Sequence, residues 1–525
     1  MQITENSAHC QGGLLLNKII YNGICVIVLT IICIMPSHEE EFSALYWLEK
    51  ADSYYKEGSF DIALLSINKS LEMEPSNIAA WRIKGDSYYA LNNYEAALDS
   101  YNRIIQLNPS DTVAYNAKAN SLLKLGNYKE AIACSNKSLE INPLDAEAWL
   151  GQGDAFYSMG KYTLALGSYN KSIEINSSLE KAWSAKAKIF NILGNHEEAL
   201  SAGERAISLN EDDAEAWLNK AIALNKMNRH EEALSSSSRS LEIDPNNALA
   251  WTNKGIALYG LGKYEDSLLS YNEGIKINSS DPVSWAGKGA TLTELGMYEE
   301  ALNSFNTSLD LDKSNSDVWT KKAQVLSNLG MYDEAIKAAS KAIDLDPFNA
   351  KAWSIKGNAQ YNLGKEADAL KSFEKTLEIN PLDSAAWYSK GLVQVELKDY
   401  ENALDSFNKS TKIDPQNIAS WINRGNVLLK LNRSEDALAS YEKALALNPS
   451  SSAAWYGKAV ALNQTGKYED ALTSYNKAIE LNPSNGAAWY GKGLVLKFLN
   501  STIESDKAIF KAEELGYNST KMEGL

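Results

Sequence analysis

The stretch AAWYGKAVALNQTGKYEDALTSYNKAIELNP, residues 453–483, carries a pattern that returns along the chain with a period of 34 residues. The pattern is a tryptophan, a small residue four positions later, Gly-x-Tyr, then Ala, Tyr, Ala and a closing Pro. Tryptophan alone reveals the period, because all 13 occurrences share one phase and Tyr115 fills the single gap. The series is Trp47, Trp81, Trp149, Trp183, Trp217, Trp251, Trp285, Trp319, Trp353, Trp387, Trp421, Trp455 and Trp489. A fixed period of this length indicates a repeat architecture, so the repeat is interpreted before any other feature.

The unit of the repeat is numbered here so that tryptophan occupies position 4. Fourteen windows of 34 residues then cover residues 44–519 without insertion or deletion. Positions 4, 7, 8 and 11 have the spacing i, i+3, i+4, i+7, which predicts that they share the inner face of a first helix. Position 8 is Gly or Ala in every window. Glycine costs roughly 1 kcal/mol in a helix interior, so its recurrence predicts the close approach of a second helix.

The end of the first helix is predicted at position 15. That position is Gly in nine windows, Asn in four and Lys398 in one. Gly and Asn best tolerate the left-handed conformation that ends many helices. Positions 20, 24 and 27 define the inner face of a second helix, and Pro at position 32 in nine of the first thirteen windows ends the unit. Each repeat is therefore predicted to be a helical hairpin, and the inner faces of its two helices become buried only when the hairpin stacks on its neighbours.

These residues resemble the tetratricopeptide repeat, which has this period and this pattern. The resemblance covers residues 44–519. It implies an all-α fold, a right-handed superhelical solenoid of about fourteen hairpins, with a concave groove lined by the first helix of each repeat. The last repeat, after Asn500, is degenerate, and we expect it to cap the solenoid with a polar outer face. Residues 520–525 are expected to form a short tail.

Composition narrows the classes of function. The net charge of −16 argues against a nucleic acid partner, which requires a basic surface. Three of the four cysteines precede residue 44, and no disulfide or zinc spacing occurs. No catalytic, metal or cofactor motif was found, and the repeats take up most of the sequence. We therefore expect a protein that is not an enzyme and needs no cofactor.

Residues 1–43 differ from the repeats. Their apolar segment at about 19–35 lies between the length of a signal-peptide core and that of a spanning helix. Lys18 precedes the segment and acidic residues follow it, so we expect an uncleaved signal-anchor helix with extracytoplasmic repeats. The alternative is a start of translation at Met35, which would give a cytoplasmic protein without a membrane segment.

The resemblance places positions 2, 5, 6, 9, 12 and 13 on the concave face, where two regions are candidate binding sites. The first combines carboxylates with tyrosines and suits a basic or proline-rich extended peptide. Its residues are Asp52, Tyr55, Asp86, Tyr89, Asp154 and Tyr157. The second is an apolar strip suited to a hydrophobic anchor. Its residues are Tyr388, Leu392, Ile422, Tyr456, Val460, Tyr490 and Leu494. The competing interpretation is that these tyrosines are ordinary features of the repeat.

The sequence therefore predicts a scaffold that binds proteins or peptides in its groove and is tethered to a membrane. Two alternatives stay open: a structural solenoid that associates with itself, and an adaptor subunit of a secretion or cell-surface complex. The sequence names no partner.

Overall fold

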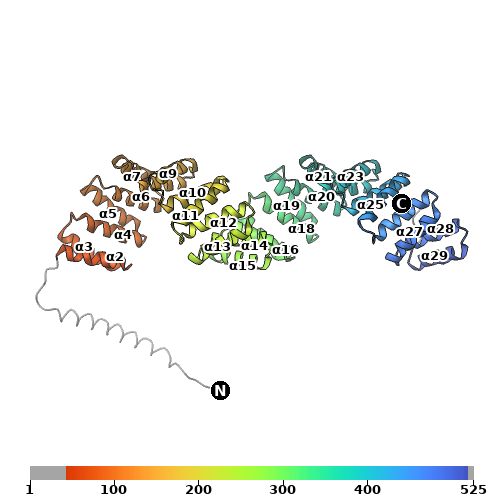
Figure 1. Cartoon of the computed structure of the whole chain (residues 1–525), viewed down its shortest axis with the longest axis horizontal. Helices are drawn as coiled ribbons and strands as arrows, with labels where there is room; N and C mark the ends of the chain where they lie inside the picture. The colour runs from red at the N-terminus through yellow and green to blue at the C-terminus, as the bar shows by residue number, and fades with distance from the viewer. Residues whose placement is uncertain (1–42, 518–525) are drawn as a thin grey trace, which may run out of the picture. The chain divides into compact units, whose positions relative to one another are not determined.

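The computed structural model describes residues 43–517, and all regular structure in that range is α-helical. Twenty-eight helices, α2 to α29, form fourteen consecutive hairpins in the described residues (Figure 1). The predicted all-α solenoid of helical hairpins is confirmed. Within residues 43–517, no helix combines the length and the apolar character needed to cross a bilayer. The predicted signal-anchor at about 19–35 lies outside the described residues and stays a prediction.

The chain divides into two compact units, residues 1–219 and 220–525, with the boundary inside α12 (Ala214–Lys226). Unit 1 contains α2 (Ala44–Lys56), α3 (Phe60–Met73), α4 (Ile78–Ala90), α5 (Tyr94–Leu107), α6 (Thr112–Lys124), α7 (Tyr128–Ile141), α8 (Ala146–Ser158), α9 (Tyr162–Ile175), α10 (Glu180–Leu193) and α11 (His196–Leu209). The even-numbered helices are the first helices of their hairpins, and the odd-numbered helices are the second.

Unit 2 repeats the same arrangement. It contains α13 (His230–Ile243), α14 (Ala248–Gly260), α15 (Tyr264–Ile277), α16 (Pro282–Glu294), α17 (Tyr298–Leu311), α18 (Ser316–Asn328), α19 (Tyr332–Leu345), α20 (Ala350–Asn362), α21 (Glu366–Ile379), α22 (Ser384–Glu396), α23 (Tyr400–Ile413), α24 (Ile418–Lys430), α25 (Ser434–Leu447), α26 (Ser452–Gln464), α27 (Tyr468–Leu481), α28 (Gly486–Phe498) and α29 (Thr502–Glu514).

The predicted left-handed residue at position 15 ends each first helix. In the repeat of residues 453–483, Gly466 has φ = 74°, and the amide of Lys467 donates to the carbonyl of Leu462 at 2.9 Å. Lys398 adopts the same conformation, with φ = 60°, although it has a side chain. A lysine there carries a steric cost that glycine avoids, so the turn is imposed by the packing of the two helices as well as by local preference.

The small residue at position 8 is matched in size to position 24 on the second helix. A Cβ atom added to Gly85 would lie 2.6 Å from Cε1 of Tyr101, and one added to Gly153 would lie 2.4 Å from Cε1 of Tyr169. Where position 8 is alanine, position 24 is usually smaller, as in the pair Ala119 and Ser135. The glycine therefore makes room for a fully buried aromatic ring.

The tryptophans are half-buried, and their indole groups form hydrogen bonds to the loop that precedes each hairpin. In the described residues, twelve of them donate Nε1–H to the backbone carbonyl six residues earlier, as Trp455 does to Pro449 at 2.9 Å. This bond ties position 4 to position 32 of the preceding repeat.

The prediction that position 7 belongs to the apolar inner face is wrong. Position 7 is lysine in most repeats, and its ammonium group lies over the indole of position 4, as Lys322 does over Trp319 at 4.9 Å. Several of these side chains also donate to position 25 of the preceding repeat. Lys84 reaches Asn68 at 2.8 Å and Gln152 reaches Asn136 at 2.7 Å. Position 7 is therefore a polar link between hairpins.

The last helix, α29, exposes the charged side chains expected of a polar cap, together with two large apolar ones. Ser505, Ala508 and Ala512 are its buried residues, whereas Ile503 and Phe510 are 70% and 62% exposed. The repeat pattern places charged or polar residues at these two positions in most other repeats. The outer surface of this hairpin is consequently more apolar than the sequence interpretation allowed.

Candidate functional site

Two carboxylates of the first candidate region are held by phenol groups from the neighbouring helix. Tyr101 on α5 donates its hydroxyl to Oδ1 of Asp86 on α4 at 2.7 Å. Tyr169 on α9 donates to Oδ1 of Asp154 on α8, also at 2.7 Å. Tyr101 and Tyr169 occupy position 24 and are buried. They were not predicted as site residues, although the joint presence of Asp at position 9 and Tyr at position 24 is visible in the sequence.

The tyrosines at position 12 are partly buried and pack against the start of the second helix. Tyr55 lies 5.5 Å from Phe60, Tyr89 lies 5.3 Å from Tyr94, and Tyr157 lies 5.8 Å from Tyr162, measured between ring centroids. These rings therefore stabilise the hairpin turn, and only part of each is available to a partner.

Asp52, the remaining residue of the first region, is the least enclosed of the three carboxylates. It pairs with Lys56 one turn later on α2, with 2.6 Å between Oδ2 and Nζ. Both side chains are exposed, so this pair contributes little to stability. The structure brings Asp52 onto the same face of α2 as Tyr55, but the tyrosine hydroxyl that holds Asp86 and Asp154 has no equivalent here, because position 24 of this repeat is Ile67.

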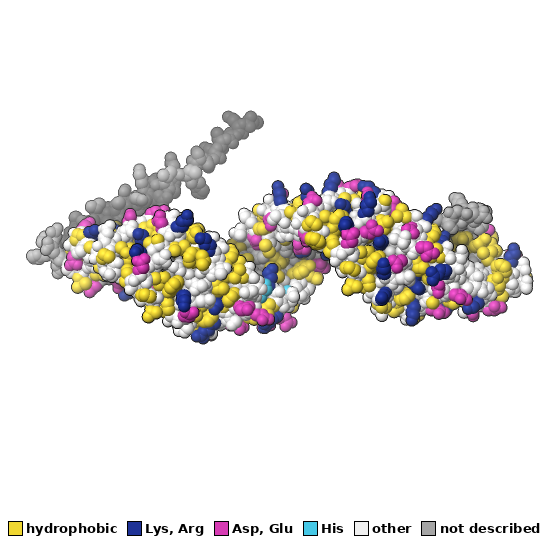
Figure 2. Space-filling view, turned by 90° about the horizontal axis from the view of Figure 1, so that it is seen from above, with side chains coloured by type: hydrophobic (Ala, Val, Ile, Leu, Met, Phe, Trp, Pro, Cys, Tyr) yellow, Lys and Arg dark blue, Asp and Glu magenta, His cyan; other side chains and the backbone are white. Residues whose placement is uncertain are grey.

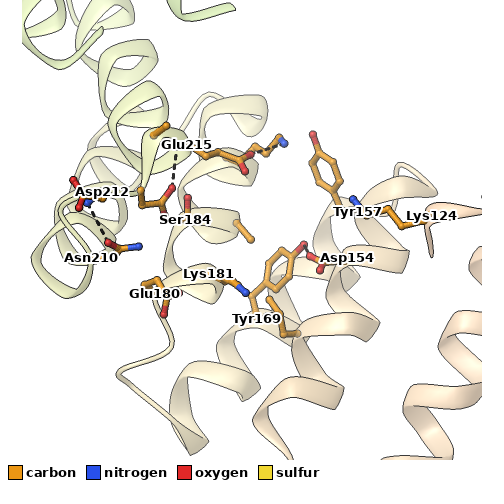
Figure 3. A pocket seen from close by; sticks show the side chains of 15 residues that line it. Lys124, Asp154, Tyr157, Tyr169, Glu180, Lys181, Ser184, Asn210, Asp212 and Glu215 are labelled. Atoms are coloured by element: carbon orange, nitrogen blue, oxygen red, sulfur yellow. Dashed lines mark hydrogen bonds and ion pairs between the residues drawn. The ribbon is translucent and has the colours of Figure 1, made fainter. Parts of the chain in front are cut away.

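A cavity of about 640 Å³ lies against the first helices α8, α10 and the start of α12, with Lys124 of α6 at its edge (Figure 3). Asp154, Tyr157 and Tyr169 line it together with Leu150 and Ser184. A second cavity of about 400 Å³ lies beside it toward α4 and is lined by Tyr89 and again by Asp154 and Tyr157. Unit 1 therefore has a hollow surface along consecutive first helices, centred on Asp154.

Burial raises the pKa of Asp154 to about 6, against the stabilising effect of the Tyr169 hydrogen bond. The nearest cation, Lys188, is committed to Glu215 at 2.7 Å and lies 5.1 Å from the ring centroid of Tyr157. Burial by itself would lower the pKa of Lys188, but the hydrogen bond and charge of Glu215 raise it overall. The charge of Lys188 lowers the pKa of Asp154 and that of Glu215 raises it, so the Asp154 carboxylate is largely removed from water and its nearby cation is already paired.

Ser184 adds a second polar group to the same cavity. Its side chain lines the cavity (Figure 3), the residue is 5% exposed, and its Oγ is buried without a hydrogen-bond partner. Most buried hydroxyl groups in native proteins are paired, so an unpaired one in a cavity wall indicates a place for a ligand group.

The second candidate region lies on α22, α24, α26 and α28 of unit 2, and its residues are partly buried. The Tyr388 hydroxyl accepts from Nδ2 of Asn423 at 3.2 Å, and the ring of Tyr490 lies 5.1 Å from that of Tyr517. The other members pack as neighbours of the hydrophobic core or on the same face of successive first helices: Leu392, Ile422, Tyr456, Val460 and Leu494.

A cavity of about 290 Å³ in this part of unit 2 is lined by Glu396, Lys398, Asn426 and neighbouring residues, and none of the strip residues borders it. The structure therefore places the strip on successive first helices, outside this cavity.

Acidic and basic side chains are interspersed over the face of the molecule shown in Figure 2. Within residues 43–517, no group of three or more His, Cys, Asp or Glu side chains is arranged to hold a metal ion.

Family comparison agrees with the repeat pattern. Models described as "Tetratricopeptide repeat" match residues 48–112, 116–180, 184–248, 355–418, 422–486 and 464–496, and two further models with that description match 292–359 and 238–268. A comparison with curated proteins gave no significant sequence match.

Solved structures similar to this chain include those of Cut9–Hcn1, YrrB and yeast Tom70. The Cut9–Hcn1 hetero-tetramer of the APC/C is 18% identical, with 85% of this chain and 95% of that chain covered and a TM-score of 0.44. YrrB, a TPR protein with an unusual peptide-binding site, is 23% identical. The match covers 36% of this chain and 96% of YrrB, with a TM-score of 0.32. Yeast Tom70 is 18% identical. The match covers 82% of this chain and 96% of the Tom70 chain, with a TM-score of 0.33.

The family models match most of residues 48–496, and the helices of the described chain recur with the same 34-residue period. The chain belongs to the tetratricopeptide repeat family.

Proposed function

We propose that the hollow surface of unit 1, centred on Asp154, is where this protein-interaction scaffold binds an extended segment of a partner protein. The repeat fold supports protein partners in general. The observation that favours this surface is the cavity of about 640 Å³, which combines a carboxylate, an aromatic ring and an unpaired buried hydroxyl. Concave surfaces with a few convergent polar groups are the usual places for ligand binding.

A charge-reversal experiment tests this proposal. Lys124 and Lys181 border both cavities of unit 1, and Lys137 and Lys171 lie on second helices with 58% and 56% exposed side chains. The full chain carrying Lys124→Glu and Lys181→Glu is compared with the chain carrying Lys137→Glu and Lys171→Glu in pull-downs followed by mass spectrometry.

Loss or exchange of partners only with the first pair supports the unit 1 surface, because both pairs change the net charge equally. Identical partner sets for the wild type and both variants would contradict the proposal.

A second candidate function is self-association through the last hairpin. The exposed Ile503 and Phe510 on α29 favour it, since apolar side chains at the end of a repeat array are usually covered or replaced by polar ones. Light scattering over a wide concentration range, with Ile503→Lys and Phe510→Lys as the comparison, tests it. A monomer at every concentration would remove this candidate.

We further propose that the apolar segment at about 19–35 tethers the array to a membrane, with the repeats on the extracytoplasmic side. The support for this proposal is the sequence alone. Membrane fractionation with alkaline extraction, followed by N-terminal sequencing of the mature protein, tests it. A mature chain that begins after residue 35 and remains in the supernatant would contradict it.

A further inference from the structure

Unit 1 contains the same carboxylate and phenol arrangement twice, two repeats apart, and the two copies differ in one respect. Asp86 with Tyr101 forms the first copy, and Asp154 with Tyr169 forms the second. In the first copy, position 5 is Arg82, whose guanidinium group bonds to Asp111 at 2.7 Å. The charge of Arg82 also lowers the pKa of Asp86, against the larger effect of burial, which raises it. The first copy therefore has a cation supplied by the chain itself.

In the second copy, both members of that ion pair are replaced by leucine. Leu150 stands at the position of Arg82, and Leu179 stands at the position of Asp111. Leu150 is 6% exposed and forms part of an apolar wall with Leu179. The cavity of about 640 Å³ lies beside this wall. The second copy keeps the buried carboxylate but has no cation at position 5, and the only cation whose charge lowers the pKa of Asp154, Lys188, comes from the next first helix and is paired with Glu215.

We propose that this cavity binds the cationic head of one lysine or arginine side chain carried by an extended segment of the partner protein. The inference rests on the proposed function of the unit 1 surface and names the chemistry that the surface selects. The ligand cation donates to the Asp154 carboxylate, of which only Oδ1 is engaged by Tyr169. The aliphatic part of the ligand side chain packs against Leu150. Charge-assisted bonds of this kind are stronger than neutral ones.

The rim of the cavity adds a second preference. Lys124 and Lys181 border the cavity and are exposed, and no ion pair of theirs was found in the described residues. These two ammonium groups attract carboxylates, whereas the carboxylates of Glu180, Asp212 and Asp213, which line the same cavity, attract cations. A segment with one basic residue and acidic residues close on either side complements both signs of charge in this wall.

Binding of a cation requires the ionised form of Asp154, so the affinity depends on pH. Its pKa of about 6 in the free protein means that it is mostly ionised at pH 7.5 and mostly protonated at pH 5. The groups whose charge or hydrogen bond acts on it are Glu147 on its own helix α8, Tyr169 on α9, Lys188 on α10 and Glu215 on α12. The same cavity is also lined by Lys124, Tyr157, Glu180, Lys181, Asp212 and Asp213. Lys188 and Glu215 form an ion pair, so the change in charge near pH 6 belongs chiefly to Asp154.

The experiment uses the full chain and a fluorescent seven-residue alanine peptide that has a central arginine flanked by two glutamates. The matched probe has norleucine in place of arginine. Fluorescence anisotropy measures both at pH 7.5 and pH 5. We expect the arginine peptide to bind at least about tenfold more tightly than the norleucine peptide at pH 7.5, since one hydrogen bond to a charged group changes the affinity by about that factor. We expect most of this preference to be lost at pH 5.

Two variants locate the binding in the cavity. Asp154→Asn keeps the shape and removes the charge, and we expect it to abolish the preference for arginine. The pair Leu150→Arg and Leu179→Asp copies the ion pair of Arg82 and Asp111 into the second site, and we expect it to exclude the peptide. Asp86→Asn is the matched control, because it removes the same type of carboxylate from the site that already has its own cation, and we expect no change. Circular dichroism and thermal melts establish that each variant is folded.

An arginine peptide that binds no better than the norleucine peptide, or that binds equally well to Asp154→Asn, would overturn this inference. If the pull-down with Lys124→Glu and Lys181→Glu still loses partners in that case, the proposed function stands and only the cationic specificity fails. If the pull-down also shows no change, both fail.

Discussion

The hydroxyl of Tyr169 donates a 2.7 Å hydrogen bond to the carboxylate of Asp154, across the two helices of one hairpin. The tyrosine is buried, and it reaches the concave side only because Gly153 on the facing helix leaves room for its ring. A residue of the hairpin core thereby fixes the position of a carboxylate in the candidate site. The packing of the repeat and the chemistry of the surface consequently depend on the same side chains.

Replacing Tyr169 with phenylalanine tests this bond. Phenylalanine already occupies position 24 in other repeats, as Phe305 and Phe373 do, so the ring is expected to fit. Loss of a hydrogen bond to a charged group should lower the free energy of unfolding by about 1.5–3 kcal/mol. Urea denaturation measures the change. Tyr271→Phe serves as the control, because Tyr271 is buried at the same position and its hydroxyl makes no hydrogen bond within residues 43–517. Equal effects of the two substitutions would contradict the role given to the bond.

Asp154→Asn is predicted to stabilise the protein at neutral pH. The pKa of Asp154 is raised to about 6 in the folded state, so between about pH 4 and pH 6 the folded state binds more protons than the unfolded state. Stability contributed by this group therefore falls as the pH rises through that window. The variant should be more stable than the wild type by about 1–2 kcal/mol at pH 7, after allowance for solvent screening, with no advantage at pH 4.

Urea denaturation of both proteins at pH 4, 5, 6 and 7 checks this prediction. An advantage of the variant that is the same at every pH would show that the Asp154 carboxyl titrates normally. An ionised buried group such as Asp154 lowers the free energy of unfolding at neutral pH. This is common for groups that bind ligands, because their surroundings suit the bound state.

Gly153→Ala is predicted to destabilise the protein, although alanine is the better helix former. The added Cβ would lie 2.4 Å from Cε1 of Tyr169, so the buried ring has to move. Overpacking of this kind costs about 1–3 kcal/mol. The double variant Gly153→Ala with Tyr169→Ser recreates the pair seen in Ala119 and Ser135. We expect the serine to relieve the clash, so the double variant should lose less stability than the two single changes predict together. Thermal melts of the three variants measure this coupling, and strict additivity would contradict the match in size.

Trp285→Ala is predicted to lower the free energy of unfolding by about 2–4 kcal/mol, toward the lower end of the range for truncation of large aromatic residues, because the indole is half-buried. The indole Nε1–H of Trp285 also donates to the carbonyl of Ser279 at 2.9 Å. Trp285→Phe keeps most of the ring and removes this bond, so it should cost about 1 kcal/mol. Denaturant titrations followed by circular dichroism separate the two contributions. An unchanged transition in the alanine variant would contradict the role of position 4 in joining successive hairpins.

Local features of the sequence were sufficient to predict the hairpins. A helix that ends at a left-handed residue such as Gly466, and a seam of apolar residues with helical spacing, are properties of adjacent residues, so a single repeat reveals them and thirteen further copies reinforce them. The error at position 7 has the same origin. Helical spacing places Lys322 beside Trp319, but spacing alone cannot distinguish a buried side chain from one that lies across an indole with its ammonium group in solvent.

The sequence by itself determined the period, the all-α hairpins and the face on which Asp154 lies. The tertiary structure decided which of the three candidate carboxylates gains a site around it. Asp52, Asp86 and Asp154 share position 9, yet their surroundings differ. Ile67 on the second helix lies beside the first. Arg82, one turn earlier on the same helix, and Asp111 before the next first helix lie near the second, and Leu150 and Leu179 take those two places near the third. Burial, pairing and cavity volume are properties of these long-range contacts, and the periodic pattern of one helix does not contain them.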